Sequence, residues 1–148
     1  MSNYPEWWDK KLTIYNKYTD SSTRAVTWYR TVLTDPLSFW KEVGDRTVVG
    51  NVELDTKSII CRIPATTKYV PIEEWLSLAD KSSKFTLQQD DIIVVGECQE
   101  EIQEGVSGKR SSDFLAKRRK FWGVMQIKTV AQDNMAGMIF KHYTVKGL

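Results

Sequence analysis

The stretch LTIYNKYTDSSTRAVTWYRTVL, residues 12–33, decides how this sequence begins to fold. Residues 12–18 alternate with the two-residue period of a β-strand that turns one face to a core. Residues 24–33 are rich in Val, Thr, Trp and Tyr, which suit a pleated surface. The Thr-Asp-Ser-Ser sequence between them, residues 19–22, is typical of a turn. The stretch therefore predicts a β-hairpin.

Short elements separated by turn residues continue along the rest of the chain. Asp35-Pro36 is expected to end the second strand, and residues 44–51 are expected to be irregular. Pro71 suits the first turn of a helix, and Trp75 lies on the apolar face of that helix. Further strands are expected at residues 37–43, 57–63, 85–87, 91–98, 121–130 and 138–145, and helices at residues 71–80 and 113–120.

The length and composition fit one globular domain. A chain of 148 residues can bury a core without a disulfide or a metal, and its 41% hydrophobic and 27% charged residues are an ordinary balance. About seven short strands and two short helices predict a mostly β (α+β) fold, either a small β-barrel or a sandwich. We expect residues 1–11 to form an N-terminal arm and residues 12–148 a single β-rich domain with a flexible loop near 97–112.

The two cysteines, Cys61 and Cys98, lie inside predicted strands among apolar neighbours. Two are too few for a disulfide scaffold, so we expect buried free thiols in a protein made in a reducing cytoplasm, whether or not the two lie side by side. The start of the chain lacks the apolar run of a signal peptide, and the longest apolar run is too short to span a membrane. The formal net charge of +2 is too small to imply nucleic acid by itself.

Six tryptophans are many for a chain of this length. We expect Trp28, Trp75 and Trp122 to lie in the core. Trp7 and Trp8 place bulky apolar surface near a terminus, and exposed apolar surface usually marks a contact. We predict that these two residues belong to a subunit interface, with an arm that folds back on its own domain as the alternative.

Residues that could carry catalysis are sparse. His142 is the only histidine, whereas an imidazole metal site would need more than one. The adjacent acids Asp90-Asp91 and Glu100-Glu101 point in different directions and do not suit a carboxylate dyad. We therefore predict no catalytic, cofactor-binding or metal site, no small-molecule substrate and no enzymatic activity.

An acidic stretch, residues 97–104, and a basic run, residues 109–120, flank a glycine-containing loop. Opposite charges beside one loop suit head-to-tail contacts between copies, although the two clusters can also neutralise each other within one chain. Ser112 is expected to cap the helix that follows. The predicted subunit-interface residues of this region are Glu100, Glu101, Arg110, Arg118 and Arg119.

The segments LTIYNKY (12–18) and WYRTVL (28–33) resemble the opening of small phage-encoded minor capsid or head–tail joining proteins. Proteins of that kind begin with a strand of the type I-x-N-x-Y and continue with W-x-R-T-V. The later matches, in order along the chain, are the strand ending at Ile63-Pro64, the helix around Trp75, and the hairpin formed by residues 85–87 and 91–97.

The resemblance covers residues 12–98, and the chain departs from the family most after Asn134-Met135, where it runs on to Leu148. It implies a structural virion protein, a head–tail connector in the neck ring of a tailed phage. The implied partners are sister copies in a ring and portal, adaptor and tail proteins, with non-specific contact to packaged DNA and none to a membrane. The implied location is the virion neck, after synthesis in the host cytoplasm.

This role would place the glycine-containing loop in the DNA channel, where Gly105, Gly108 and Lys109 would line or close it. Two other functions stay open from the sequence. The basic segment 109–122, with its aromatic neighbours, could bind nucleic acid. A small β-barrel could also hold a ligand at a site that no motif reveals.

Overall fold

A computed structural model describes residues 10–50, 52–64, 68–119, 123–133 and 142–148. The fold is mostly antiparallel β with two short α-helices, which confirms the predicted mostly β (α+β) class. None of the helices within these ranges has the length and apolar character needed to cross a membrane. The strands are β1 (Lys10–Thr19), β2 (Val26–Val49), β3 (Val52–Pro64), β4 (Ile92–Val95), β5 (Val124–Asp133) and β6 (His142–Gly147), and the helices are α1 (Ile72–Leu76), a 3-10 turn (Lys81–Ser83) and α2 (Ser111–Arg118).

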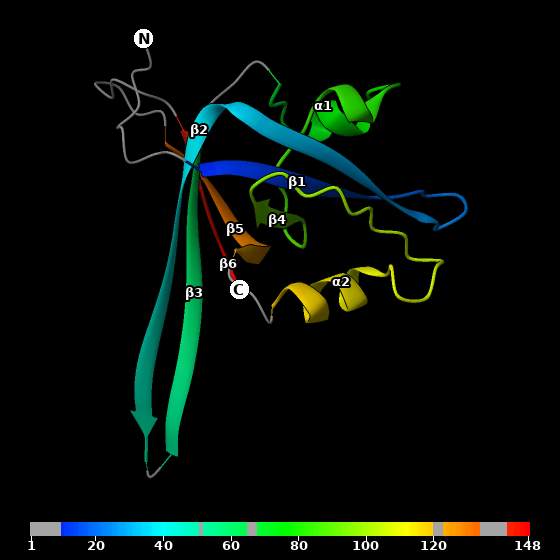
Figure 1. The fold of residues 1–148 in the computed structure, drawn as a ribbon. Coiled ribbons are helices and arrows are strands. Elements are labelled where there is room, and N and C mark those ends of the chain that lie inside the picture. The colour runs from blue at the N-terminus through cyan, green and yellow to red at the C-terminus, as the bar shows by residue number, and fades with distance from the viewer. Residues whose placement is uncertain (1–9, 51, 65–67, 120–122, 134–141) are drawn as a thin grey trace.

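The strand pairings form a closed order, β1-β2-β3-β6-β5-β4, in which β4 pairs with β1. Two strands change partner along their length and so make the corners of the barrel. The first part of β2 pairs with β1, and from Phe39 onward β2 pairs with β3. Likewise β5 pairs with β4 through Gln126 and with β6 from Ile127. Of the two predicted architectures, the pairing order is that of a barrel (Figure 1).

Two layers of apolar side chains hold the fold together. The interior of the barrel contains Leu12 and Ile14 of β1 with Ile93 of β4, all fully buried. The neighbouring residues Tyr15 and Ile92 point to the opposite face because successive strand residues alternate. Helix α2 covers that outer face. Both faces of β4 are therefore buried, and both carry apolar side chains. The outer layer consists of Tyr15, Ile92, Val94, Cys98, Ile102, Phe114, Leu115 and Val124, with Trp28 packed against it.

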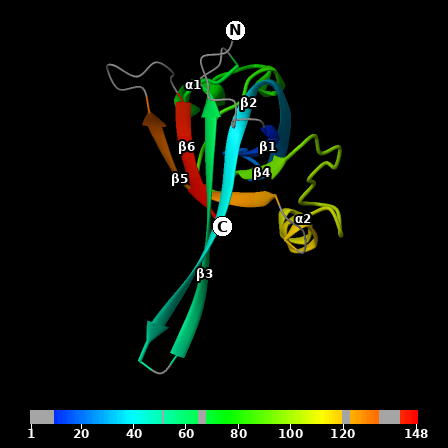
Figure 2. The same cartoon turned by 60° about the vertical axis from the view of Figure 1, so that its left-hand side comes forward.

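The most distinctive feature is a two-stranded ribbon that extends away from the barrel (Figures 1 and 2). It comprises residues 43–58, and we call it the projecting hairpin. Its register runs from Val43 opposite Ser58 to Val49 opposite Val52. Gly50 at the tip has a φ of 63°, a conformation that glycine adopts without steric cost. The rest of the molecule lies at the other end of this ribbon.

The sequence prediction failed in this region. Asp35-Pro36 does not end β2, and residues 44–49 are strand rather than irregular. Pro36 is tolerated because it lies where the register of β2 against β1 shifts, between Leu33 and Ser38. A proline at such an irregularity does not remove a regular ladder hydrogen bond.

Other predicted elements are shorter or displaced. The helix predicted at 71–80 covers only Ile72–Leu76, followed by the 3-10 turn. The predicted strand at 85–87 is a single bridge between Tyr69 and Phe85. Ser112 does not cap α2, because the helix begins at Ser111, two residues earlier than predicted, and Arg110 occupies the cap position. The ends of the predicted strands at 121–130 and 138–145 fall partly outside the described residues.

The predicted core residues are partly confirmed. Trp75 is fully buried, Trp28 is half-buried, and Trp122 lies outside the described residues. Cys61 and Cys98 are buried free thiols, as predicted, and they belong to different apolar layers. Burial raises the pKa of Cys61 because the thiolate would lose its hydration.

Gly147 should be indispensable for closing the barrel, because β6 there lies against both Ile59 of β3 and Ile127 of β5. A Cβ at this position would clash with the Gln126 carbonyl oxygen and lie 2.7 Å from Met125 Cγ. We predict that Gly147→Ala lowers the free energy of unfolding by about 1–3 kcal/mol, measured by urea denaturation. The matched control is Gly105→Ala, where an added Cβ meets nothing within 4 Å. Equal stability of the two variants would contradict this packing.

Candidate functional site

The projecting hairpin has two open edges. Strand β3 pairs with β6 only from Ile59 onward, and β2 pairs with β1 only up to Ser38. The outer edges of residues 43–49 and 52–58 therefore have no strand partner within the described parts of the chain. A two-stranded ribbon is marginally stable by itself, and open edges are templates for pairing with another chain. These edges are the first candidate for a functional surface.

A third open edge lies on the barrel itself. Residues 26–33 of β2 pair with β1 on one side, and no described strand pairs with them on the other. The corresponding end of β1 is treated differently. Gln88 Nε2 donates to the Lys17 carbonyl oxygen at 2.7 Å, and the Lys17 N–H donates to Asp91 Oδ1 at 2.9 Å. Side chains thus satisfy the β1 edge beyond its pairing with β4, whereas no described strand pairs with the β2 edge.

A cleft of about 640 Å³ runs beside this edge of β2. One wall is formed by residues 26–30 of β2 and the other by residues 101–106, with Tyr15 contributing from β1. The second wall is held in place by a hydrogen bond from Trp28 Nε1 to Glu104 Oε1 at 2.9 Å. Arg30 Nε also donates to the Cys98 carbonyl oxygen. The cleft therefore lies between an open strand edge and a fixed segment.

Glu100 ties the acidic segment to the basic helix. Its carboxylate accepts hydrogen bonds from Lys117 Nζ at 3.0 Å and Arg118 Nη2 at 3.1 Å. The hydrogen bond from Lys117 is the main reason that the pKa of Glu100 is lowered. Its backbone carbonyl oxygen accepts from the Tyr15 hydroxyl at 2.6 Å. Because Lys117 and Glu100 are well exposed to solvent, this pairing positions the segment more than it stabilises the fold.

Helix α2 packs through its apolar side and turns its cations toward its own chain. The Phe114 ring meets the Tyr15 ring edge-to-face, with centroids 5.3 Å apart. Arg118 Nη2 lies 3.1 Å from Cys98 Sγ, and Arg119 Nη2 donates to the Leu148 carbonyl oxygen at 3.3 Å. Burial raises the pKa of Tyr15, so its hydroxyl stays protonated and donates. Together with Lys117, three of the cations in the predicted nucleic-acid segment 109–122 thus have partners within this chain.

A buried carboxyl group fixes the junction between β1 and β4. Asp91 Oδ2 accepts from Asn16 Nδ2 at 2.7 Å, and Asp91 Oδ1 accepts from Gln88 Nε2 at 3.1 Å as well as from the Lys17 N–H. The Asn16 amide also donates to the Thr86 carbonyl oxygen at 2.6 Å. Burial raises the pKa of Asp91 to about 7, in spite of the donors that favour the carboxylate.

The structure brings some of the predicted site residues together and separates others. Glu101 and Gly105 line the cleft beside β2. Gly108 and Lys109 lie with Glu100 at a second hollow of about 520 Å³ between the loop and α2. Arg110 is exposed at the start of α2, whereas Arg118 and Arg119 lie at its other end. Trp7 and Trp8 lie outside the described residues.

The loop near 97–112 was predicted to be flexible. In the structure its ends are held by the contacts of Cys98, Glu100 and Glu104 described above, and its exposed tip comprises residues 105–109. At the tip the Gly108 N–H donates to Asp113 Oδ2 at 3.1 Å. The predicted interface and channel roles of this region stay predictions.

Sequence reasoning missed the open edges altogether. The β-branched residues of 47–49 and Val52 were a signal for strand, but the neighbouring glycines and Pro36 outweighed them. The backbone of His142 is in β6, opposite Pro64 and Asp133, and its side chain is not described. In the ranges that the structure describes, no group of three or more His, Cys, Asp and Glu side chains is placed to bind a metal ion.

The molecule is therefore a small antiparallel β-barrel with a projecting hairpin and an open edge on β2. The chain belongs to the family DUF6751, a family of unknown function, whose model matches residues 7–148. No curated protein matches the chain, and no solved structure matches it.

The Asp91 carboxyl group should give the protein a distinctive pH dependence. Its pKa is about 7 in the folded protein and 3.8 in a model compound, so folding favours the protonated form. Below about pH 4 the Asp91 carboxyl group is protonated in both the folded and the unfolded protein. Its favourable contribution to the free energy of unfolding is then fully present. The free energy of unfolding then falls as pH rises to about 7, because the folded state must ionise a buried acid.

The measurement is urea denaturation at several pH values for the wild type and for Asp91→Asn. The wild type should lose stability relative to the variant between about pH 4 and about pH 7. The amide of the variant cannot ionise, so the free energy of unfolding of the variant should lack the fall with pH that ionisation of Asp91 causes. A wild type that instead gains stability relative to the variant across this range would show that the folded state prefers the carboxylate.

Proposed function

We propose that this chain is a structural virion protein of a tailed phage, a head–tail connector that forms part of the neck ring. The segments that resemble minor capsid and head–tail joining proteins lie on elements that build the barrel. Residues 12–18 are in β1 and residues 28–33 are in β2, and Ile63-Pro64 ends β3. The segments that carry the resemblance thus lie on three consecutive strands, β1, β2 and β3.

The observation that carries the proposal is the projecting hairpin with its two open edges. A chain gains little stability from a ribbon that extends beyond its own core, because two strands without a third partner are marginal. Such a ribbon is useful when another subunit completes it. A ring between portal and tail needs this kind of surface on every subunit, and it needs no catalytic group.

The glycine-containing loop takes the channel position in this proposal. Its exposed tip, residues 105–109, would face the packaged DNA, and Gly105, Gly108 and Lys109 would line or close the channel. Lys117 and Arg118 are already paired with Glu100, so the surface there holds DNA less firmly than its basic sequence implies. Weak, non-specific contact suits a channel through which DNA must move. We place the protein in the virion neck, with portal, adaptor and tail proteins as partners.

The proposal predicts the outcome of shortening the hairpin in the phage itself. Residues 44–57 are replaced by Asn-Gly, which favours a tight two-residue turn between Val43 and Ser58. The purified variant should unfold within about 1 kcal/mol of the wild type, because the barrel is intact. Phage that carry it should accumulate DNA-filled heads without tails, as seen by electron microscopy of lysates.

The control is phage with Glu73→Gln, a change at an exposed position of α1, away from the hairpin and the loop, which should give normal particles. Mass spectrometry of purified wild-type virions should detect the chain. Virions that lack the chain, or tailed infectious particles at normal yield from the shortened variant, would contradict the proposed function.

A further inference from the structure

We propose that the projecting hairpin of one copy adds as an antiparallel strand to the open edge of β2, residues 26–32, in a second copy. The inference rests on the proposed ring and names the two surfaces that meet in it. The donor is the outer edge of β3 in the hairpin, residues 52–58. The acceptor is the edge of β2 that borders the 640 Å³ cleft.

The acceptor edge offers outward-pointing backbone groups. Lys17 lies opposite Trp28, and the N–H and C=O of Lys17 bond to Asp91 and Gln88, away from β2. In an antiparallel pair, two opposite residues either exchange both hydrogen bonds or both direct their groups outward. Trp28 therefore directs its N–H and C=O toward the open edge.

The same alternation extends along the strand. The Asp20 N–H donates to the Ala25 carbonyl oxygen at 2.9 Å, which marks an inward-bonded pair one residue before Val26. Residues two apart on a strand direct their N–H and C=O groups to the same side. The residues whose groups point outward are therefore Val26, Trp28, Arg30 and Val32. No backbone group in the described chain bonds to them on that side. This is the backbone pattern that strand addition requires.

The space beside the edge suits an extended chain. Residues 101–106 stand away from β2 and form the far wall of the cleft, so the edge is accessible along residues 26–30. The wall is anchored through Glu104, which accepts from both Trp28 Nε1 and the Ser111 N–H. An incoming strand would lie between a regular edge and a preformed wall, as in grooves that bind extended peptides.

Donor and acceptor match in length. Residues 52–58 and residues 26–32 each span seven residues, about 23 Å of extended chain. Pairing them would satisfy one open edge of the hairpin and the open edge of the barrel at once. One chain thus carries both halves of a complementary contact, which is the reason to choose a second copy as the occupant.

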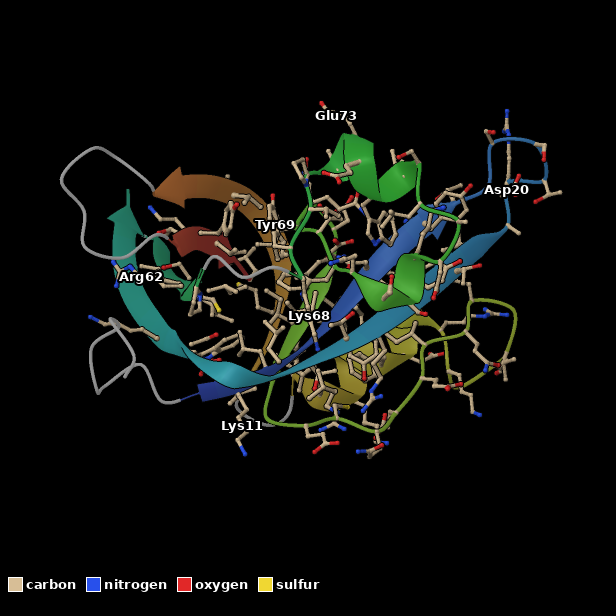
Figure 3. The ribbon with its side chains drawn as sticks, turned by 90° about the horizontal axis from the view of Figure 1, so that it is seen from above. Lys11, Asp20, Arg62, Lys68, Tyr69 and Glu73 are labelled. Carbon is tan, nitrogen blue, oxygen red and sulfur yellow. The ribbon has the colours of Figure 1, made fainter. Side chains whose placement is uncertain are left out.

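The hairpin cannot reach the acceptor edge of its own chain. Figures 1 and 2 show it extending from the barrel away from the β1–β2 turn and the 97–110 segment. Seen from above in Figure 3, Arg62 on β3 and Asp20 in the β1–β2 turn lie on opposite sides of the molecule. The donor edge, residues 52–58, and the acceptor edge, residues 26–32, are different surfaces on different sides of the molecule. The contact between copies is therefore head-to-tail. Contacts of this kind generate closed rings when the rotation between copies allows it.

The test uses two variants of the full chain that each lack one half of the contact. The donor-deficient variant has residues 44–57 replaced by Asn-Gly. The acceptor-deficient variant is Val26→Pro, which removes an outward N–H, and Val26→Ala is its matched control. If Val26→Pro does not fold by circular dichroism, Val32→Pro with Val32→Ala serves the same purpose.

Native mass spectrometry should show oligomers larger than dimers for the wild type and for Val26→Ala. Each deficient variant alone should be monomeric. A mixture of the two should form dimers and lose all larger species, because only one donor and one acceptor remain. A wild type that stays monomeric, a proline variant that assembles like its alanine control, or a mixture that forms no dimer would each overturn the proposal.

This outcome is separable from the fate of the proposed function. If rings form as described but virions lack the chain, the pairing stands and the neck role fails. If the chain is present in virions but Val26→Pro still assembles and supports tail attachment, the neck role stands and this pairing fails.

Discussion

The need to satisfy the backbone groups along strand edges governs this molecule. A closed order of antiparallel pairings satisfies the edges of the barrel, which is why the order returns from β4 to β1. Three parts of the sheet extend beyond that closure: the end of β1, the start of β2 and the two strands of the projecting hairpin. At the end of β1 the side chains of Gln88 and Asp91 cap the Lys17 backbone. Along β2 and in the projecting hairpin, no strand in the described part of the chain pairs with these edges, and we propose that another chain does.

The acidic segment and the basic helix pair within the chain, which is one of the two arrangements that their sequence left open. Glu100 pairs with Lys117 and Arg118 within the chain, so the acidic segment and the basic helix hold each other against the outer face of the barrel. Phe114 and Tyr15 supply the apolar contact beneath them. The result is a fixed wall beside the β2 edge. In our account, assembly depends on backbone edges, and the charges keep the cleft beside one of those edges in shape.

The sequence revealed local structure well and long-range structure poorly. The hairpin of residues 12–33 could be predicted because alternation and a turn are local signals. The burial of Trp75 followed from the helical spacing around it. The projecting hairpin was missed because Pro36 and Gly44 are local break signals, whereas β2 continues through them by exchanging one partner strand for another. Which strand pairs with which depends on contacts far apart in the chain, and no local pattern encodes it.

Residues 43–58 pair only with each other and have no further strand partner among the residues that the structure describes. Hydrogen–deuterium exchange of the dilute monomer measures this directly, because amides without tertiary support exchange through local opening at little cost. The account predicts that amides of residues 44–57 exchange orders of magnitude faster than those of residues 59–63, where β3 continues into the barrel. Protection of the hairpin equal to that of the barrel in the monomer would contradict the account.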